Sequence, residues 1–133
     1  MVSKPAAAKS YRELAVWQKG IELVKGVYLL SEGFPQREIY GLTNQIRRAA
    51  VSIPSNIAEG QARGHTPEFR RYLQIALGSL AEVDTQLELA IQLSFISQQD
   101  SVKVADIIVE LRKMLYGLIS NLPKREVKLT TGH

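Results

Sequence analysis

Apolar residues recur along almost the whole chain at the three- and four-residue spacing of a helix that buries one face. No segment keeps the period-two alternation of a half-buried strand for long. The clearest stripe follows residue 66 and holds a heptad rhythm. It consists of Phe69, Leu73, Ala76, Leu80, Val83, Leu87 and Ala90. This pattern predicts an all-α protein.

Three further stripes precede and follow this one. They consist of Leu14, Trp17, Ile21, Val24 and Tyr28; of Ile39, Leu42, Ile46, Ala50, Ile53 and Ile57; and of Val104, Ile108, Leu111, Leu115 and Leu118. Residues typical of helix ends separate the segments: Ser10 suits an N-cap, Gly60 a stop, and Thr66 a cap before Pro67. Short connections force neighbouring helices antiparallel. We predict an antiparallel up-down-up-down four-helix bundle over residues 11–122, with flexible tails at 1–10 and 123–133.

Two residues stand inside helical patterns that they disfavour. Pro54 removes a backbone donor and crowds the preceding turn, so it predicts a kink in the second helix. Ser52 or another neighbour is expected to bind the Ala50 carbonyl that proline leaves free. Gly78 costs about 1 kcal/mol relative to alanine in a helix interior, which favours close approach of a neighbouring helix there.

Composition restricts the class of protein. The chain has 133 residues, no cysteine, 45% hydrophobic and 23% charged residues, as expected for one globular domain of ordinary composition. No run of about 18 apolar residues is present, which argues against a membrane span, and we expect a cytoplasmic protein. Apolar residues outside the stripes widen either the core or an oligomer interface. They are Leu77, Ile91, Leu93 and Ile107.

The residues of common catalytic and metal sites are missing from the sequence. His65 and His133 are the two histidines, and neither follows a glutamate at the spacing of a dinuclear carboxylate centre. With no cysteine, no zinc set can be assembled. Glu59 and Glu82 form an acid/base pair in one interpretation, whereas pairing of each with an arginine is the ordinary alternative. We therefore expect no enzyme activity, no metal and no cofactor.

Polar residues also form lines at helical spacing. The lines on the second and third helices contain Asn44, Arg48, Ser52, Ser55 and Glu59, and Ser79, Glu82 and Gln86. One interpretation is a buried polar network that fixes helix register, because buried ionic groups must be paired. Its expected members are Arg48, Ser52, Asn56, Glu59, Ser79 and Glu82.

Charge is distributed unevenly along the sequence. Residues 37–71 carry six Lys/Arg against three acids, whereas residues 72–102 carry four acids and no Lys or Arg. The basic segment suggests phosphate contacts, although ordinary solvated arginines remain the alternative for each residue. The candidate contacts are Arg47, Arg63, Arg70 and Arg71. Few aromatic residues accompany them, so binding is expected to be electrostatic and weakly sequence-specific.

The run QIRRAAVSIPSNIAEG at residues 45–60 resembles the signature of a known family. LAVWQ at 14–18, Phe34-Pro35, YGL at 40–42 and Gly78-Ser79 with Glu82 follow its pattern at the expected places. The family is that of four-helix bundle proteins encoded in intervening sequences of bacterial 23S rRNA genes, and the resemblance covers about residues 11–120. It implies an up-down bundle, and related proteins assemble as ring-like homopentamers. One related branch comprises accessory proteins of diversity-generating retroelements, whose basic surface is implicated in binding nucleic acid and a reverse transcriptase.

Two functional hypotheses follow. The first is a non-enzymatic homo-oligomer, with a pentamer favoured by the resemblance, that binds structured RNA or other nucleic acid through its basic residues. The second is a protein-interaction scaffold that binds no nucleic acid, which the acidic segment 72–102 and the extra apolar residues suit equally well. A small-molecule enzyme is a distant third.

Overall fold

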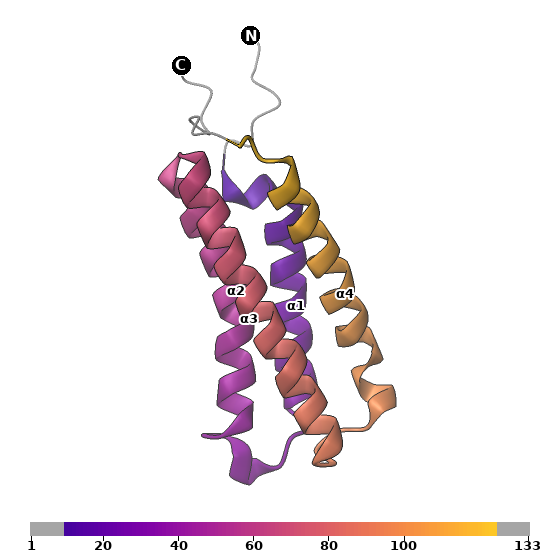
Figure 1. Ribbon diagram of the computed structural model, residues 1–133. Coiled ribbons are helices and arrows are strands. Elements are labelled where there is room, and N and C mark those ends of the chain that lie inside the picture. Colours follow the sequence, from indigo (N-terminus) through magenta and orange to yellow (C-terminus); the bar gives the residue numbers. More distant parts are fainter. Residues whose placement is uncertain (1–9, 125–133) are drawn as a thin grey trace.

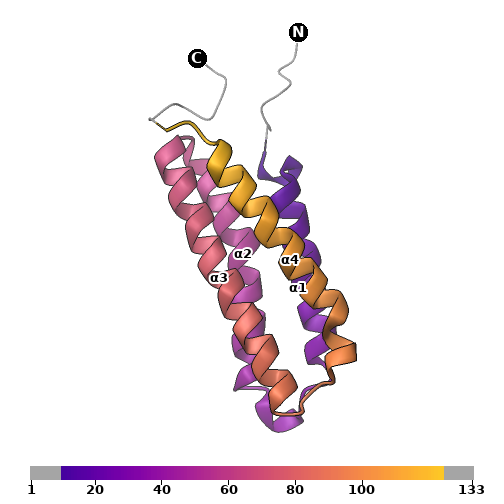
Figure 2. The ribbon, with the colours of Figure 1, turned by 45° about the vertical axis from the view of Figure 1, so that its right-hand side comes forward.

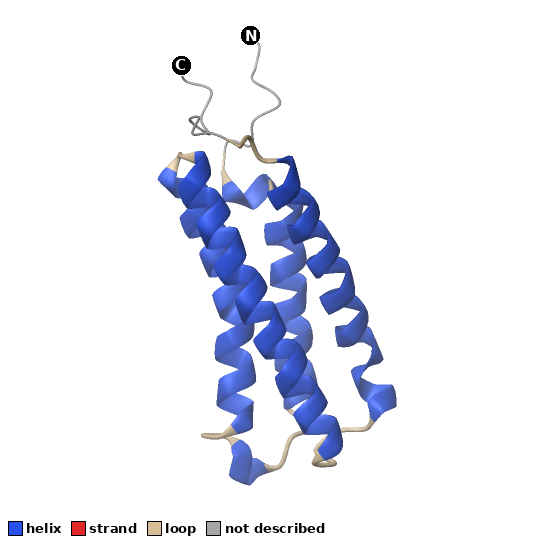
Figure 3. Ribbon diagram, in the orientation of Figure 1, coloured by secondary structure: helices blue, strands red, loops and turns tan. Residues whose placement is uncertain are grey.

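Four α-helices form the molecule in the computed structural model, which describes residues 10–124. They are α1 (Ala15–Ser31), α2 (Leu42–Arg63), α3 (Thr66–Gln92) and α4 (Gln98–Asn121), with short 3-10 helices η1 (Tyr11–Glu13) and η2 (Gln36–Glu38). No strand occurs within these residues (Figure 3). In Figure 1 the chain reverses direction at each connection, and α1 lies beside α2 and α4. Figure 2 shows that α3 lies beside α2. Helix α3 also contacts α4, so each helix has two neighbours in the bundle. The all-α four-helix bundle is confirmed.

The predicted core stripes of α3 and α4 are those that the structure buries. All seven stripe residues of α3, from Phe69 to Ala90, are buried. On α4, Val104, Ile108 and Leu111 are buried with Leu115, while Leu118 is half-buried. Ile107, one of the extra apolar residues, also lies in the core. Periodicity alone therefore identified the buried faces of α3 and α4.

The buried face of α1 differs from the predicted one. Its buried line is Val16, Gly20, Leu23 and Val27, whereas Tyr28 of the predicted stripe is 43% exposed. Gly20 faces α2 so closely that an added Cβ atom would lie 3.4 Å from Cβ of Pro54. The helix thus turns its glycine toward its neighbour, which a pattern of large apolar residues does not indicate.

The first two predicted helices each begin with a short 3-10 turn. Ser10 caps η1 and not a long helix, because Leu14 is extended between η1 and α1. The segment after Gln36 similarly forms η2 before α2 begins. There the Glu38 carboxylate accepts a 3.0 Å hydrogen bond from the backbone N–H of Leu42 and so satisfies a free donor of the first turn.

Gly60 does not end the second helix as predicted. The helix continues to Arg63 and ends at Gly64, whose φ of 78° is the left-handed conformation that glycine adopts without strain. Gly60 instead lies against α3, where an added Cβ atom would stand 2.7 Å from Cβ of Tyr72 and 3.1 Å from Cδ1 of Phe69. Its missing side chain is what lets α2 and α3 approach at this end.

The expected role of Gly78 is wrong. Gly78 is exposed, and an added Cβ atom would meet nothing within 4 Å. Pro54 is buried inside α2, which is one uninterrupted helix, and the kink stays a prediction. The Ser52 hydroxyl does not bind the Ala50 carbonyl, because it is engaged with Ser79.

None of the helices in residues 10–124 is long and apolar enough to cross a membrane. The tails predicted at 1–10 and 123–133 fall outside the described residues, apart from Ser10, Pro123 and Lys124.

Candidate functional site

One line of polar side chains follows the outer junction of α2 and α3, and we call it the polar seam. On α2 its members recur every three or four residues, which places them on one face. The seam consists of Arg48, Ser52, Asn56, Glu59 and Arg63 on α2, and Tyr72, Ser79, Glu82 and Gln86 on α3. From Arg48 to Arg63 it extends about 22 Å along the helix axis. Four residues of the family signature at 45–60 lie on it: Arg48, Ser52, Asn56 and Glu59.

The centre of the seam is a direct bridge between the two helices. The hydroxyls of Ser52 and Ser79 are 2.9 Å apart, and Asn56 Nδ2 donates to Ser52 Oγ at 2.9 Å and to the Ser52 carbonyl at 2.8 Å. Ser79 is buried, and Ser52 and Asn56 are half-buried. These three residues form the polar contact that was expected to fix register.

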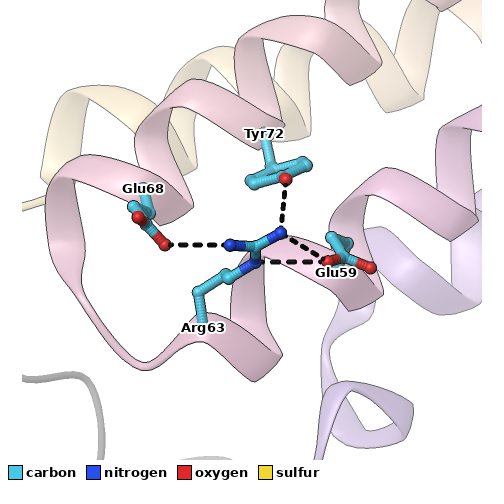
Figure 4. A network of polar contacts seen from close by, with 4 residues as sticks. All are labelled: Glu59, Arg63, Glu68 and Tyr72. Carbon is cyan, nitrogen blue, oxygen red and sulfur yellow. Dashed lines mark hydrogen bonds and ion pairs between the residues drawn. The ribbon is translucent and has the colours of Figure 1, made fainter.

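One end of the seam is a network of polar contacts around Arg63 at the turn between α2 and α3 (Figure 4). Arg63 donates to Glu59 Oε2 at 2.9 Å and to the Tyr72 hydroxyl at 3.0 Å, and it lies 3.8 Å from Glu68 Oε1. The hydrogen bond to Glu59 is the main cause that raises the pKa of Arg63 above its ordinary value. Arg63 therefore connects α2 to α3, and the carboxylates of Glu59 and Glu68 lie beside its guanidinium group.

The opposite end of the seam is a hollow, and here the buried-network hypothesis is wrong for three residues. Arg48 and Glu82 are exposed, and neither forms an ion pair or hydrogen bond with any residue in 10–124. Both line a hollow between the helices. Glu59, the third, is exposed and bonds Arg63. Long charged side chains at the outer junction of two helices keep their charged groups in water. These residues therefore do not need a partner inside the protein.

The structure does not bring the four candidate phosphate-binding arginines together. Arg47 lies 16 residues before Arg63, which is about 24 Å along the helix and about 160° around it. Its Nε donates to Ser31 Oγ at 2.8 Å, and its guanidinium lies 4.6 Å from the Tyr28 ring centroid on α1. Arg47 thus belongs to the α1–α2 contact.

The remaining three arginines gather at the α2–α3 turn. Arg70 is half-buried and donates to the carbonyl of Pro123 after α4. Arg71 is exposed, lies 4.7 Å from the Tyr72 ring centroid and has no acidic partner within residues 10–124. Tyr72 consequently contacts both Arg63 and Arg71. Sequence reasoning did not assign Tyr72 to the site, because its proximity to Arg63 depends on the tight turn at Gly64.

The proposed acid/base pair of Glu59 and Glu82 is not formed. Arg63 donates to both Glu59 and Tyr72, so these two residues lie at the same height in the bundle. Glu82 follows Tyr72 by ten residues, which is about 15 Å along α3. Nor does any group of three or more His, Asp or Glu side chains in residues 10–124 have a metal-binding arrangement.

An apolar groove separates α1 from α4 on another side of the bundle. It has a volume of about 520 Å³ and is lined by apolar residues that include Ile21, Leu29, Leu30 and Ile107. Two lysines, Lys25 and Lys103, and two acids, Glu22 and Asp100, also line it. Leu29 is 72% exposed there.

Comparison with known proteins gives the family. The sequence model described as 23S rRNA-intervening sequence protein matches residues 12–117, which is most of the chain. The chain belongs to this family. The resemblance carried by residues 45–60 is therefore confirmed.

Among solved structures, five chains match. One is a protein with unknown function from the S23 ribosomal protein family of Bacteroides thetaiotaomicron, 25% identical with a TM-score of 0.74. The match covers 80% of this chain and 100% of that chain. None of the curated proteins matches. The intervening-sequence family thus accounts for the bundle, and its description names a genomic origin without an activity.

Proposed function

We propose that this member of the intervening-sequence family is a non-enzymatic protein that binds structured RNA or other nucleic acid at the α2–α3 turn. The observation that carries the proposal is the group of Arg71 and Tyr72. Arg71 is an exposed cation without an acidic partner in residues 10–124, and it lies over an aromatic ring. A cation beside an aromatic side chain offers a phosphate contact and a stacking surface together.

The structure changes the set of residues assigned to this role. Arg71 is the main phosphate contact, and Arg70 adds a second cation at the same end. Arg63 positions Tyr72 and has its charge offset by Glu59 and Glu68. Arg47 is removed from the interface, because it contacts α1 on a different side of the bundle.

The test is a fluorescence anisotropy titration of a labelled RNA hairpin with the protein at several salt concentrations. We expect the affinity to fall steeply as salt rises, and Arg71→Ala to reduce the slope of log affinity against log salt by about one. Arg37→Ala is the matched control, because Arg37 is also an exposed arginine near an aromatic ring, Phe95, but lies at the other end of the bundle. An absence of binding at low salt, or equal losses in the two variants, refutes the proposal.

Assembly with copies of itself is the second part of the proposal, with a pentamer favoured by the family resemblance. Large apolar side chains remain exposed on the single chain, among them Leu29, Leu93 and Val102. Burying such residues is the usual driving force of association. Light scattering coupled to size exclusion measures the mass directly, and a monomer at micromolar concentration contradicts this part.

A protein-interaction scaffold is the competing function, and the apolar α1–α4 groove favours it. Purification from the native host with and without nuclease separates the two. Recovery of partners that survives nuclease supports the scaffold, and loss of all partners after nuclease supports nucleic-acid binding.

A further inference from the structure

The hollow at the Arg48 end of the polar seam has the features of a ligand site. Its volume is about 350 Å³, and it opens between α2 and α3. Six of its seven lining residues carry a polar side chain, and the lining consists of Asn44, Gln45, Arg48, Ala49, Ser52, Glu82 and Gln86. Pockets that bind small ligands commonly hold a few polar groups that converge on one point.

Gln86 is the buried polar group in this lining. Its residue is 7% exposed, and its Oε1 atom is buried with no hydrogen-bond partner among residues 10–124. Native proteins satisfy almost all buried polar atoms, so an unpaired amide oxygen on a side chain that lines a hollow requires an explanation. A donor group on a bound ligand provides one.

Arg48 and Glu82 line the same hollow with opposite charges. They form no ion pair with one another or with other described residues, whereas Arg63 pairs with Glu59 and Arg112 pairs with Asp84. The guanidinium group of Arg48 and the carboxylate of Glu82 are therefore both available to a ligand that lies between them. That ligand must present acceptors on one edge and donors on another.

We propose that this hollow binds a guanine base. Guanine presents two adjacent acceptors, O6 and N7, which match the two-pronged donor of Arg48. Its N1–H and N2 amino donors match two acceptors, the carboxylate of Glu82 and the Oε1 atom of Gln86, which must turn from its buried position toward the hollow to accept. Adenine and cytosine each offer a single exocyclic donor group, and uracil offers one N–H, so they leave one of the two acceptors unpaired.

The guanine has two possible sources, a free guanosine nucleotide or an unpaired guanine in RNA. Unpaired bases expose the edges that proteins read in RNA. Arg48 lies about 22 Å along the seam from Arg63, so one RNA strand of several nucleotides can reach both the hollow and the α2–α3 turn. Only the RNA source rests on the proposed function; a free nucleotide does not depend on it.

The first experiment is a calorimetric titration of the full chain with guanosine monophosphate, inosine monophosphate and adenosine monophosphate. Inosine lacks the N2 amino group and adenine reverses the donor pattern, so we expect each to bind roughly tenfold more weakly than guanosine. Amide chemical shifts in NMR spectra are expected to change around Ala49 and Gln86. Equal affinity for the three nucleotides, or no binding at millimolar concentration, overturns the proposal. Chemical-shift changes confined to Arg71 and its neighbours also overturn it, because they show binding of the phosphate alone.

Two variants test the named contacts. Glu82→Gln is expected to weaken guanosine binding at least tenfold, whereas Glu88→Gln, on an exposed acid of the same helix outside the hollow, is expected to leave it unchanged. Gln86→Met keeps the side-chain size but removes the amide. We expect it to abolish the preference for guanosine over inosine and to raise the thermal midpoint of the free protein, since an unpaired buried oxygen is removed. A variant with full guanosine preference contradicts the role of Gln86.

The RNA arm uses the labelled hairpin with and without one unpaired guanine. Guanosine binding without RNA binding upholds the hollow and refutes the proposed function. RNA binding that depends on Arg71 but not on Glu82 or on the unpaired guanine, with no nucleotide binding, refutes the guanine site and leaves the proposed function standing.

Discussion

The contact at Gly60 leads to a quantitative prediction about how closely α2 and α3 pack. In Gly60→Ala the new methyl group would lie 2.7 Å from Cβ of Tyr72 and 3.1 Å from Cδ1 of Phe69. The Tyr72 Cβ atom is attached directly to the α3 backbone and cannot move by a change of rotamer. The helices must therefore separate, and overpacking of this kind costs about 3 kcal/mol at the upper end of its range.

Alanine is also the better helix former, which returns about 1 kcal/mol, so the net loss is about 2 kcal/mol. Gly78→Ala is the matched control: it makes the same substitution inside α3, at an exposed position where the methyl group meets nothing within 4 Å. That variant is expected to gain about 1 kcal/mol. The two variants should then differ by about 3 kcal/mol in the free energy of unfolding.

Urea denaturation followed by circular dichroism measures this difference, with the slope m compared among the three proteins. A change in midpoint at constant m reports stability alone. If Gly60→Ala is as stable as Gly78→Ala, the close approach of α2 and α3 is not what requires glycine at position 60, and the reasoning fails.

Other substitutions test the remaining contacts by the same denaturation assay. Ser52→Ala leaves the buried Ser79 hydroxyl without its partner and should cost about 1 kcal/mol. The double variant with Ser79→Ala should be close to the native protein, because no buried hydroxyl is then left unpaired. Additive losses would contradict a direct bridge. Pro54→Ala keeps the Cβ atom that faces Gly20 and restores a backbone donor, so it should raise stability by up to about 3 kcal/mol, and a loss would show that the proline ring is required for packing. Leu111→Ala leaves a cavity in a fully buried position and should cost about 2–5 kcal/mol; a cost below 1 kcal/mol would contradict its place in the core.

Sequence periodicity predicted the bundle because most of its core is made of large apolar residues at regular spacing. It failed on α1, where Gly20 faces α2 and carries no hydrophobic signal of its own. The sequence suggested a helix stop at Gly60 and a close helix contact at Gly78. The position of α3 shows instead that Gly60 makes the close contact, whereas Gly78 faces no neighbouring helix.

The candidate site shows the same limit more sharply. Arg47 and Arg48 are adjacent, yet the 100° turn between neighbouring residues sends one to Ser31 on α1 and the other to the hollow. Periodicity did identify the line that contains Ser52 and Ser79. Which charged residues along it find partners depends on the neighbouring helix, and residue spacing within one helix does not contain that information.

The connection between α2 and α3 has a kinetic consequence. Two residues, Gly64 and His65, separate these helices, so their pairing closes a very short loop. The α1–α4 pairing joins opposite ends of the described chain, as the bridge from Lys19 to Glu110 illustrates, and must close a far longer one. Because the entropy lost on closure grows with loop length and local contacts form fastest, we expect the α2–α3 hairpin to form early in folding and α4 to dock last. Hydrogen exchange pulsed during refolding would then protect amides near Ser79 before those near Leu111.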